Sequence, residues 1–378
     1  MTVEAHRDLR MDETALIINA IITEETVLTL LKQLQEPAPS GTVLHTRTPI
    51  LQQLALEAGI PTEHFSVHFL GTRSPAVLLS VRQPLWFDAH ADTISYLFPR
   101  STNEPSSPIL PNCAHRPRVA REFPAAVLRW NKSLDGYERV SEGVIGSTGS
   151  REQEFKPYYT ASEKPKDGFK PSDRVVYTPA FTLENELVTG NMDNAAGLAV
   201  CLASLRALSA VAQKNGITLT DLGVGFVFPD SEEGLEHDPA YFSRGARAII
   251  NRAGFAGKLP ERVVNVDGHD TMDPQPVVRY AAYVSANKGP VIPPDVYAEF
   301  ESFLTSVVPY SVSSRMTEDG AAVSRSDDAA YMEVMENIMP IGYDVRDPHF
   351  NDGRPTANLK GLVQTAKAVA WIAAEMPR

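Results

Sequence analysis

Residues 76–92 of the chain read AVLLSVRQPLWFDAHAD. The density of Val, Leu and Trp from Ala76 to Phe87 predicts a buried strand, because strands covered on both faces form near-continuous apolar runs. The run stops at Asp88, and His90 and Asp92 follow at once. In open α/β sheets the ligand crevice lies at the carboxyl ends of the strands. This segment therefore predicts a central strand of an α/β sheet and the sheet edge that carries polar chemistry.

Helical and strand patterns alternate on both sides of this segment. Apolar residues recur at helical spacing over 24–34 and 48–58, and a nearly uncharged, Ala-rich helix is expected over 195–212. The elements predicted after it are strand 223–228, helix 239–252, strand 262–266, helices 294–307 and 328–336, strand 338–343 and helix 356–375. Such alternation predicts an α/β fold with a mixed, mostly parallel sheet sandwiched by helices.

The segment between these groups of elements has a different character. Six prolines fall between Pro99 and Pro124, and up to about residue 182 the chain offers short β-like pieces and Gly-rich turns with little helical periodicity. We therefore expect an inserted small β-barrel-like domain over 96–185. The main α/β domain would then be formed by 1–95 and 186–378.

Composition excludes several classes of protein. The 378 residues are 43% hydrophobic and 22% charged, unlike a disordered, collagen-like or coiled-coil chain. With 35 Lys and Arg against 47 Asp and Glu, the net charge is -12 and no basic cluster is present, so we expect neither nucleic acid nor a membrane as partner. Cys113 and Cys201 cannot form a disulfide framework, and residues 1–34 lack a long apolar run. These features predict a cytoplasmic protein.

Five strand or helix ends each carry side chains that can bind a metal ion or a proton. Taken singly, each has an ordinary interpretation such as a helix N-cap, a turn or a solvated surface pair. The conjunction favours a site, because the ends of neighbouring strands converge at one edge of an α/β sheet. In chain order the residues are His90 with Asp92, Asp193, Glu232 with Glu233, Asp267 and His349.

The residue types indicate a site for two divalent cations. Zinc-like ions take imidazole nitrogen and carboxylate oxygen as ligands. Asp193, Glu233 and Asp267 together set three negative charges against the four positive charges of two ions, and a bridging hydroxide would balance them. Asp193 is the natural bridge, since a carboxylate has two oxygens and paired ions lie roughly 3.5–4 Å apart. His90 and Asp267 would complete one ion, and Glu233 and His349 the other.

Two acidic residues next to these ligands have other roles open to them. Asp92 can accept the free ring N–H of His90 and so fix its tautomer. Glu232 is adjacent to a ligand but is not needed as one, so it fits a general base that takes a proton from water and passes it to a leaving amine. A carboxylate beside two cations needs burial to raise its pKa enough for that task.

The order of these motifs resembles that of the tetrahedral aminopeptidases, dinuclear metallo-aminopeptidases of the MH clan that include glutamyl and deblocking aminopeptidases. The likeness covers nearly the whole chain and lies in the segments 30–34, 39–41, 89–92, 168–188, 193–197, 231–234 and 287–290. It implies metal ligation by His90, Asp193, Glu233, Asp267 and His349, with Glu232 as the base.

The resemblance also implies cofactors and partners. Two divalent metal ions are expected per chain, zinc first, with cobalt or manganese as alternatives. Peptides would be the substrates, and the chain would form a homo-oligomer between a dimer and a dodecamer, with the inserted domain as a lid or oligomerisation module.

Spacing selects this family within the clan. Between Asp92 and Asp193 lie 100 residues, enough for the inserted domain, whereas carboxypeptidase-like relatives place their extra domain after the later ligands. The chain departs from the family pattern at Thr93, at Ala195 and over 236–243. A carboxypeptidase-like enzyme or N-acyl amino acid deacylase of the same clan, and a catalytically silent oligomeric scaffold, are the alternatives to an aminopeptidase.

Overall fold

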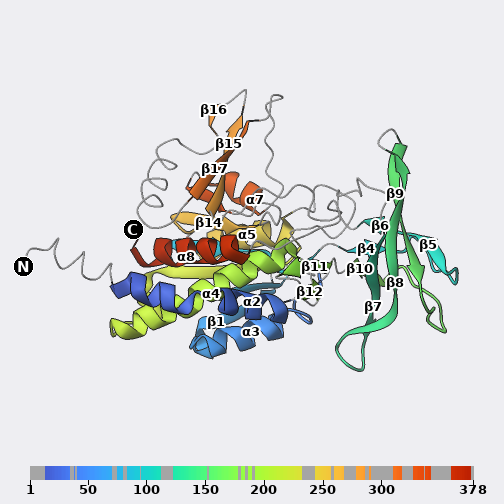
Figure 1. Ribbon diagram of the computed structural model, residues 1–378, viewed down its shortest axis with the longest axis horizontal. Coiled ribbons are helices and arrows are strands. Elements are labelled where there is room, and N and C mark those ends of the chain that lie inside the picture. Colours follow the sequence, from blue (N-terminus) through green and yellow to red (C-terminus); the bar gives the residue numbers. More distant parts are fainter. Residues whose placement is uncertain are drawn as a thin grey trace, which may run out of the picture.

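Figure 1 shows the computed structural model of the protein, a layered α/β body beside an antiparallel sheet. The structure describes residues 13–34, 38, 41–69, 75–79, 83–93, 95–111, 122–150, 153–177, 180–183, 186–189, 192–231, 243–256, 259–267, 278–285, 289–290, 310–316, 327–335, 337–341 and 359–375.

The body is built on a nine-stranded sheet. Four adjacent strands are parallel, in the order β13 (Val224–Pro229), β3 (Leu85–Asp88), β14 (Arg262–Val266) and β18 (Ile338–Ile341). Antiparallel strands extend it beyond β13 with β2 (Pro75–Leu79) and β1 (Phe65–Phe69), and beyond β18 with β15 (Val278–Ser285). Both β16 (Gly289–Pro290) and β17 (Tyr310–Met316) pair with β15. Strand β3 is therefore interior to the sheet.

Helices cover both faces of this sheet (Figure 1). One face packs against α2 (Glu24–Gln33), α3 (Thr48–Glu57), α4 (Met192–Lys214) and α8 (Leu359–Glu375), in a single apolar core. The other face packs against α5 (Arg244–Ala256) and α7 (Asp328–Met332). A further helix, Glu13–Ile21, meets α2 at an angle of 49°. Two 3-10 turns, η1 (Thr62–His64) and η2 (Leu219–Leu222), complete the helical elements of the described chain.

Side chains along the parallel strands alternate between the two cores, as the pleat of a strand requires. In β3, Phe87 packs towards α4 and α8 while Trp86 packs towards α5 and α7, and Val264 and Val263 of β14 divide in the same way. Burying an apolar side chain of this size contributes about 1.5–3 kcal/mol. Because a slip of one residue would exchange the two faces, the register of β3 is fixed from both sides.

The second sheet has seven strands, all drawn from residues 96–177. In spatial order they are β5 (Ser106–Pro108), β9 (Gln153–Ala161), β8 (Gly136–Ser150), β7 (Glu122–Asn131), β10 (Arg174–Tyr177), β4 (Tyr96–Leu97) and β6 (Leu110–Pro111), all antiparallel. Phe98 stacks on Phe169 with ring centroids 4.7 Å apart, and Tyr159 meets both rings edge-on. Arg129 fastens the loop after β9 by a bidentate contact to Asp173 at 2.8 and 2.7 Å.

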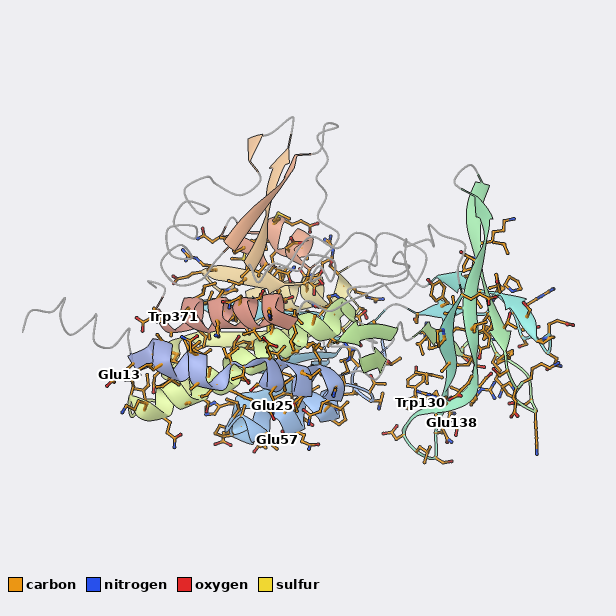
Figure 2. All side chains as sticks on the ribbon, viewed as in Figure 1. Glu13, Glu25, Glu57, Trp130, Glu138 and Trp371 are labelled. Carbon is orange, nitrogen blue, oxygen red and sulfur yellow. The ribbon has the colours of Figure 1, made fainter. Side chains whose placement is uncertain are left out.

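An aromatic contact joins the second sheet to the α/β body. Trp130 of β7, labelled in Figure 2, lies edge-on to His45 in the segment between α2 and α3, with ring centroids 4.4 Å apart. Tyr137 of β8 packs against the same indole at 5.2 Å. On the return towards α4 the chain forms a separate two-stranded sheet from β11 (Ala180–Leu183) and β12 (Glu186–Thr189).

The predicted fold class is confirmed, with a mixed sheet between helical layers and a curled antiparallel sheet from the inserted region (Figure 1). One predicted element is wrong, because the run from Ala76 to Phe87 forms two strands, β2 and β3, with β13 between them. Pro84 explains the break, since proline offers no N–H to a sheet ladder. The helix predicted over 294–307 lies outside the described residues.

Helix α4 is the central helix of the body. An 18-residue window within Asn194–Lys214 has a mean hydropathy of 1.8, enough by composition to cross a membrane, but 83% of that window is buried inside the protein. The helix also approaches β14 closely, because a Cβ added at Gly197 would collide with the carbonyl oxygen of Val266 and the side chain of Asn194.

We therefore expect Gly197→Ala to lower the free energy of unfolding by about 1–3 kcal/mol, since the added methyl group overpacks the contact between α4 and β14. Urea-induced unfolding followed by circular dichroism would measure the loss. Gly136→Ala is the matched control, because a Cβ there would lie 3.7 Å from the nearest atom, the carbonyl oxygen of Leu134. Equal losses in the two variants would contradict the close approach of α4.

Candidate functional site

Three neighbouring parallel strands end at the same edge of the sheet. Asp88, the last residue of β3, pairs with Val227 of β13 on one side and with Asn265 of β14 on the other. The ladder continues past the end of β3, because the N–H of Ala89 donates to the carbonyl of Val227 at 3.0 Å and that of Ala91 to Pro229 at 2.7 Å. The segment after β3 is thus held almost as firmly as the strand itself.

His90 lies between two carboxylates at this edge. Its Nε2 is 3.2 Å from Asp267 Oδ1, at the end of β14, and its Nδ1 is 3.4 Å from Asp92 Oδ1 and 3.2 Å from the backbone oxygen of Asp92. The imidazole is 1% exposed, Asp92 is fully buried and Asp267 is 7% exposed. The structure therefore brings together three of the residues that the sequence singles out, with one carboxylate at each ring nitrogen.

Further buried carboxylates lie next to this group. Burial raises the pKa of Asp88 to about 7, although the hydroxyl of Tyr331 donates to Asp88 Oδ2 at 2.7 Å and opposes the shift. Burial also raises the pKa of Asp327 well above its usual range, and the nearby charges of Asp88 and Asp267 add to this. Crowded carboxylates in a buried site repel one another. A bound cation would reduce this repulsion, as protonation of the carboxylates does in its absence.

Two of the described side chains, His90 and Asp267, are donors of the kind that zinc takes, although no group of three or more His, Cys, Asp or Glu among the described residues is arranged to hold an ion. An imidazole nitrogen and a carboxylate oxygen are zinc ligands, and at zinc distances of about 2.0–2.2 Å two ligands of a tetrahedral ion lie roughly 3.3 Å apart. The separation of 3.2 Å between His90 Nε2 and Asp267 Oδ1 agrees with this value. The other ring nitrogen of His90 faces Asp92, as is usual for a metal-binding histidine whose tautomer is fixed by a carboxylate.

Helix α4 starts at the same corner. Asn194 is fully buried, and its amide nitrogen donates to the carbonyl of Val266 at 2.9 Å while its amide oxygen accepts from the N–H of Gly197 at 2.9 Å. The second bond is the one that an N-cap side chain makes. Asp193 precedes Asn194 and Asp267 follows Val266, so these bonds bring the backbones of the two acidic positions together. The side chain of Asp193 lies outside the described residues.

The end of β13 leads towards the other predicted residues. Asp230 is fully buried, and its Oδ1 accepts from the N–H of Gly41 at 2.8 Å. Burial raises its pKa well above the usual range, and the neighbouring charge of Asp92 adds to this. Ser231 has a φ of 67°, a left-handed conformation that is costly for serine and is common at functional sites. Glu232, Glu233 and His349 lie outside the described residues.

Sequence reasoning missed several buried charged residues around this site: Arg47, Asp88, Asp230 and Asp327. Two of them carried a usable signal. Asp88 ends β3 two positions before His90, and Asp230 directly follows β13 two positions before Glu232, so each stands close in the sequence to a candidate residue. Asp327 and Arg47 gave no comparable pattern, because the elements that bring them to the site are remote in the sequence.

No protein-family model and no curated protein matches this sequence. Among solved structures, the chain is similar to a TET aminopeptidase from a marine sediment archaeon of the Thaumarchaeota, at 12% identity and a TM-score of 0.63 over 93% of this chain and 97% of that one. An aminopeptidase of the archaeon Desulfurococcus kamchatkensis gives 13% identity and a TM-score of 0.57 over 93% and 95%. For the TET1 peptidase of Pyrococcus horikoshii the values are 15% and 0.56 over 92% and 99%.

The chain thus has the fold of the tetrahedral aminopeptidases over nearly its whole length, as the order of its motifs predicts. At identities of 12–15%, the similarity to these structures shows the fold of the chain.

We expect Asn194→Asp to lower the free energy of unfolding by about 1–3 kcal/mol, because the second carboxylate oxygen would face the carbonyl of Val266 with no proton between two acceptors. Chemical denaturation would measure the loss. Asn215→Asp provides a control at the exposed end of α4, where the same amide-to-carbonyl bond, from Asn215 to Val211 at 2.9 Å, can be replaced by water. A loss at Asn194 no larger than that at Asn215 would contradict this account.

Proposed function

We propose that this protein is a metal-dependent aminopeptidase that removes N-terminal residues from peptides. The observation that carries the proposal is the placement of His90 between Asp92 and Asp267 at the carboxyl ends of parallel strands, in a fold that the chain shares with aminopeptidases. Buried imidazole and carboxylate groups at a shared strand edge favour cation-assisted hydrolysis over a role as scaffold, because a scaffold has no need to bury charges.

The proposed metal ligands are His90, Asp193, Glu233, Asp267 and His349. Two divalent ions, zinc first and cobalt or manganese as alternatives, would polarise the scissile carbonyl and lower the pKa of a water molecule. Asp92 holds the ring of His90 by its second nitrogen, as the distance of 3.4 Å indicates. This contact leaves Nε2, which faces Asp267, as the nitrogen that would bind a cation.

Glu232 is the proposed general base. It accepts a proton as water adds to the scissile carbonyl carbon, and it returns that proton to the nitrogen of the leaving peptide as the carbon–nitrogen bond breaks. The products are a free amino acid and a peptide shortened by one residue. Ser231, directly before this residue, has a left-handed φ of 67°, and because such strained conformations cluster at functional sites this supports a role for the glutamate.

A homo-oligomeric, cytoplasmic enzyme is part of the same proposal. The TET1 peptidase of Pyrococcus horikoshii can assemble into a tetrahedron or a large octahedral shell. In this chain the second sheet stands beside the α/β body and offers the edge strands β5 and β6 for contacts between subunits (Figure 1). Light scattering of the purified protein would give the number of subunits.

Purified wild-type protein is expected to hold about two divalent ions per chain after equilibration with zinc. The variant Glu232→Gln should retain that metal content but lose turnover by about 10²–10⁴-fold, because it removes the base without removing a ligand. Elemental analysis and hydrolysis of aminoacyl-anilides would measure the two properties. Full activity in Glu232→Gln would refute the assignment of the base, and loss of metal in this variant would make the residue a ligand instead.

The free amine of the substrate should be required. We expect a dipeptide with a free N-terminus to be cleaved with a kcat/KM at least about 100-fold higher than its N-acetylated form, because an acyl group removes the charge that marks the chain end and fills its space. Amino acid release can be followed by chromatography for both substrates. Preference for the acetylated form would identify an N-acyl amino acid deacylase.

A further inference from the structure

The guanidinium of Arg47 is fully buried, which is rare for a charged side chain and requires strong partners. Its Nη1 donates to the carbonyl of Ala91 at 3.0 Å, and its Nη2 donates to the carbonyl of Leu34 at 3.1 Å. Leu34 is the C-cap of α2, where carbonyls lack helical partners and a cation is favoured. Ala91 separates His90 from Asp92, so one side chain ties a helix end to the candidate site.

Both backbone polar groups of Ala91 are hydrogen-bonded. Its N–H donates to the carbonyl of Pro229 at the end of β13, at 2.7 Å, and its carbonyl accepts from Arg47. Two residues further on, Thr93 donates its N–H to the carbonyl of Ala38 at 2.8 Å and accepts from the N–H of Ala38 at 3.0 Å. His90 therefore belongs to a segment fixed by β13 on one side and by the α2–α3 connection, residues 34–47, on the other.

The α2–α3 connection also holds a second strand end. The N–H of Gly41 donates to Asp230 Oδ1 at 2.8 Å, and Asp230 lies two positions before Glu232. The same short stretch of chain thus contacts the backbone that carries His90 and the strand end that leads to the proposed base. The packing of α2 and α3 on the apolar core does not require these contacts, because the bonds from Arg47 to Ala91 and from Gly41 to Asp230 join polar groups.

The chemistry of Arg47 suits this task. Arginine presents several N–H donors in a rigid planar fork and stays charged, whereas lysine is a point charge on a flexible stem. The two carbonyls that Arg47 reaches belong to different elements, so two donors of fixed geometry are needed to hold them at once. Charge-assisted bonds of this kind are about twice as strong as neutral ones.

We propose that Arg47 is a positioning residue that fixes the orientation of the His90–Asp92 pair by holding the peptide carbonyl between them. The inference rests on the proposed function for its consequence, which is tighter binding of the metal. The positioning itself is a property of the chain without metal and can be measured separately.

The experiment compares wild type with Arg47→Lys, Arg47→Met and Thr93→Val. Hydrogen–deuterium exchange of the metal-free proteins reports on peptides that cover residues 88–93, and competition with a chelator gives the affinity for zinc. Ser204→Ala is the matched control, since Ser204 is also fully buried and donates to the carbonyls of Val200 and Ala366 at 2.8 Å. It lies three turns along α4 from Asn194, away from the site.

Both Arg47 variants should exchange faster over residues 88–93 while peptides from α8 stay unchanged, and their zinc affinity should fall about 10–100-fold, as for other residues that orient ligands. Thr93→Val keeps the shape of the side chain but loses its bond to Ala38, so it should give a smaller change in the same direction even if Arg47→Met fails to fold. Ser204→Ala should lower the unfolding temperature with neither effect.

Unchanged exchange over 88–93, or unchanged zinc affinity, in folded Arg47→Lys would overturn the proposal. A zinc affinity that falls equally in Ser204→Ala would also overturn it, because the effect would then follow stability alone. Wild-type protein that binds none of zinc, cobalt and manganese refutes the proposed function directly, whatever the variants do to exchange, so the two failures are told apart.

Discussion

The continuation of the β3 ladder past the end of the strand is the interaction on which the site depends. Strand β3 is paired with β13 on one side and with β14 on the other, and it is covered on both faces. Beyond its end, the N–H groups of Ala89 and Ala91 still donate to carbonyls of β13. His90 is therefore as fixed as a strand residue, although it lies two positions beyond the strand. A flexible loop at this point would have to order the imidazole at a cost in conformational entropy each time a ligand bound.

The same edge of the sheet concentrates charge that the protein buries. Asp88, Asp92 and Asp327 are fully shielded from solvent, and the pKa of Asp88 is raised to about 7 by its burial. Such a cluster opposes folding unless protons, hydrogen bonds or cations balance it. The proposed hydrolytic function accounts for its persistence, since such a site needs a strong, water-excluded field around the scissile bond. Arg47 adds a positive charge to the same region from behind the strand ends.

The second sheet and the α/β body have cores of different kinds. The body has apolar layers on both faces of a mixed sheet, whereas the second sheet is stabilised by the stacked rings of Phe98, Phe169 and Tyr159 and by the fork of Arg129. The contact of Trp130 with His45 joins them at the α2–α3 connection, which also holds the ends of β3 and β13. A movement of the second sheet would therefore act first on the α2–α3 connection, which contacts the ends of β3 and β13.

The sequence by itself determined the α/β class, the central strand and the convergence of His90, Asp92 and Asp267, because apolar runs, breakers and polar strand ends are local signals. It did not separate β2 from β3 by the intervening β13, since strand order depends on packing between remote segments. Only the tertiary structure revealed Arg47, Asp230 and Asp327 at the site. Contacts between remote segments place them there, such as that from Arg47 to Ala91 across 44 residues and that from Gly41 to Asp230 across 189, and no periodic pattern records such contacts.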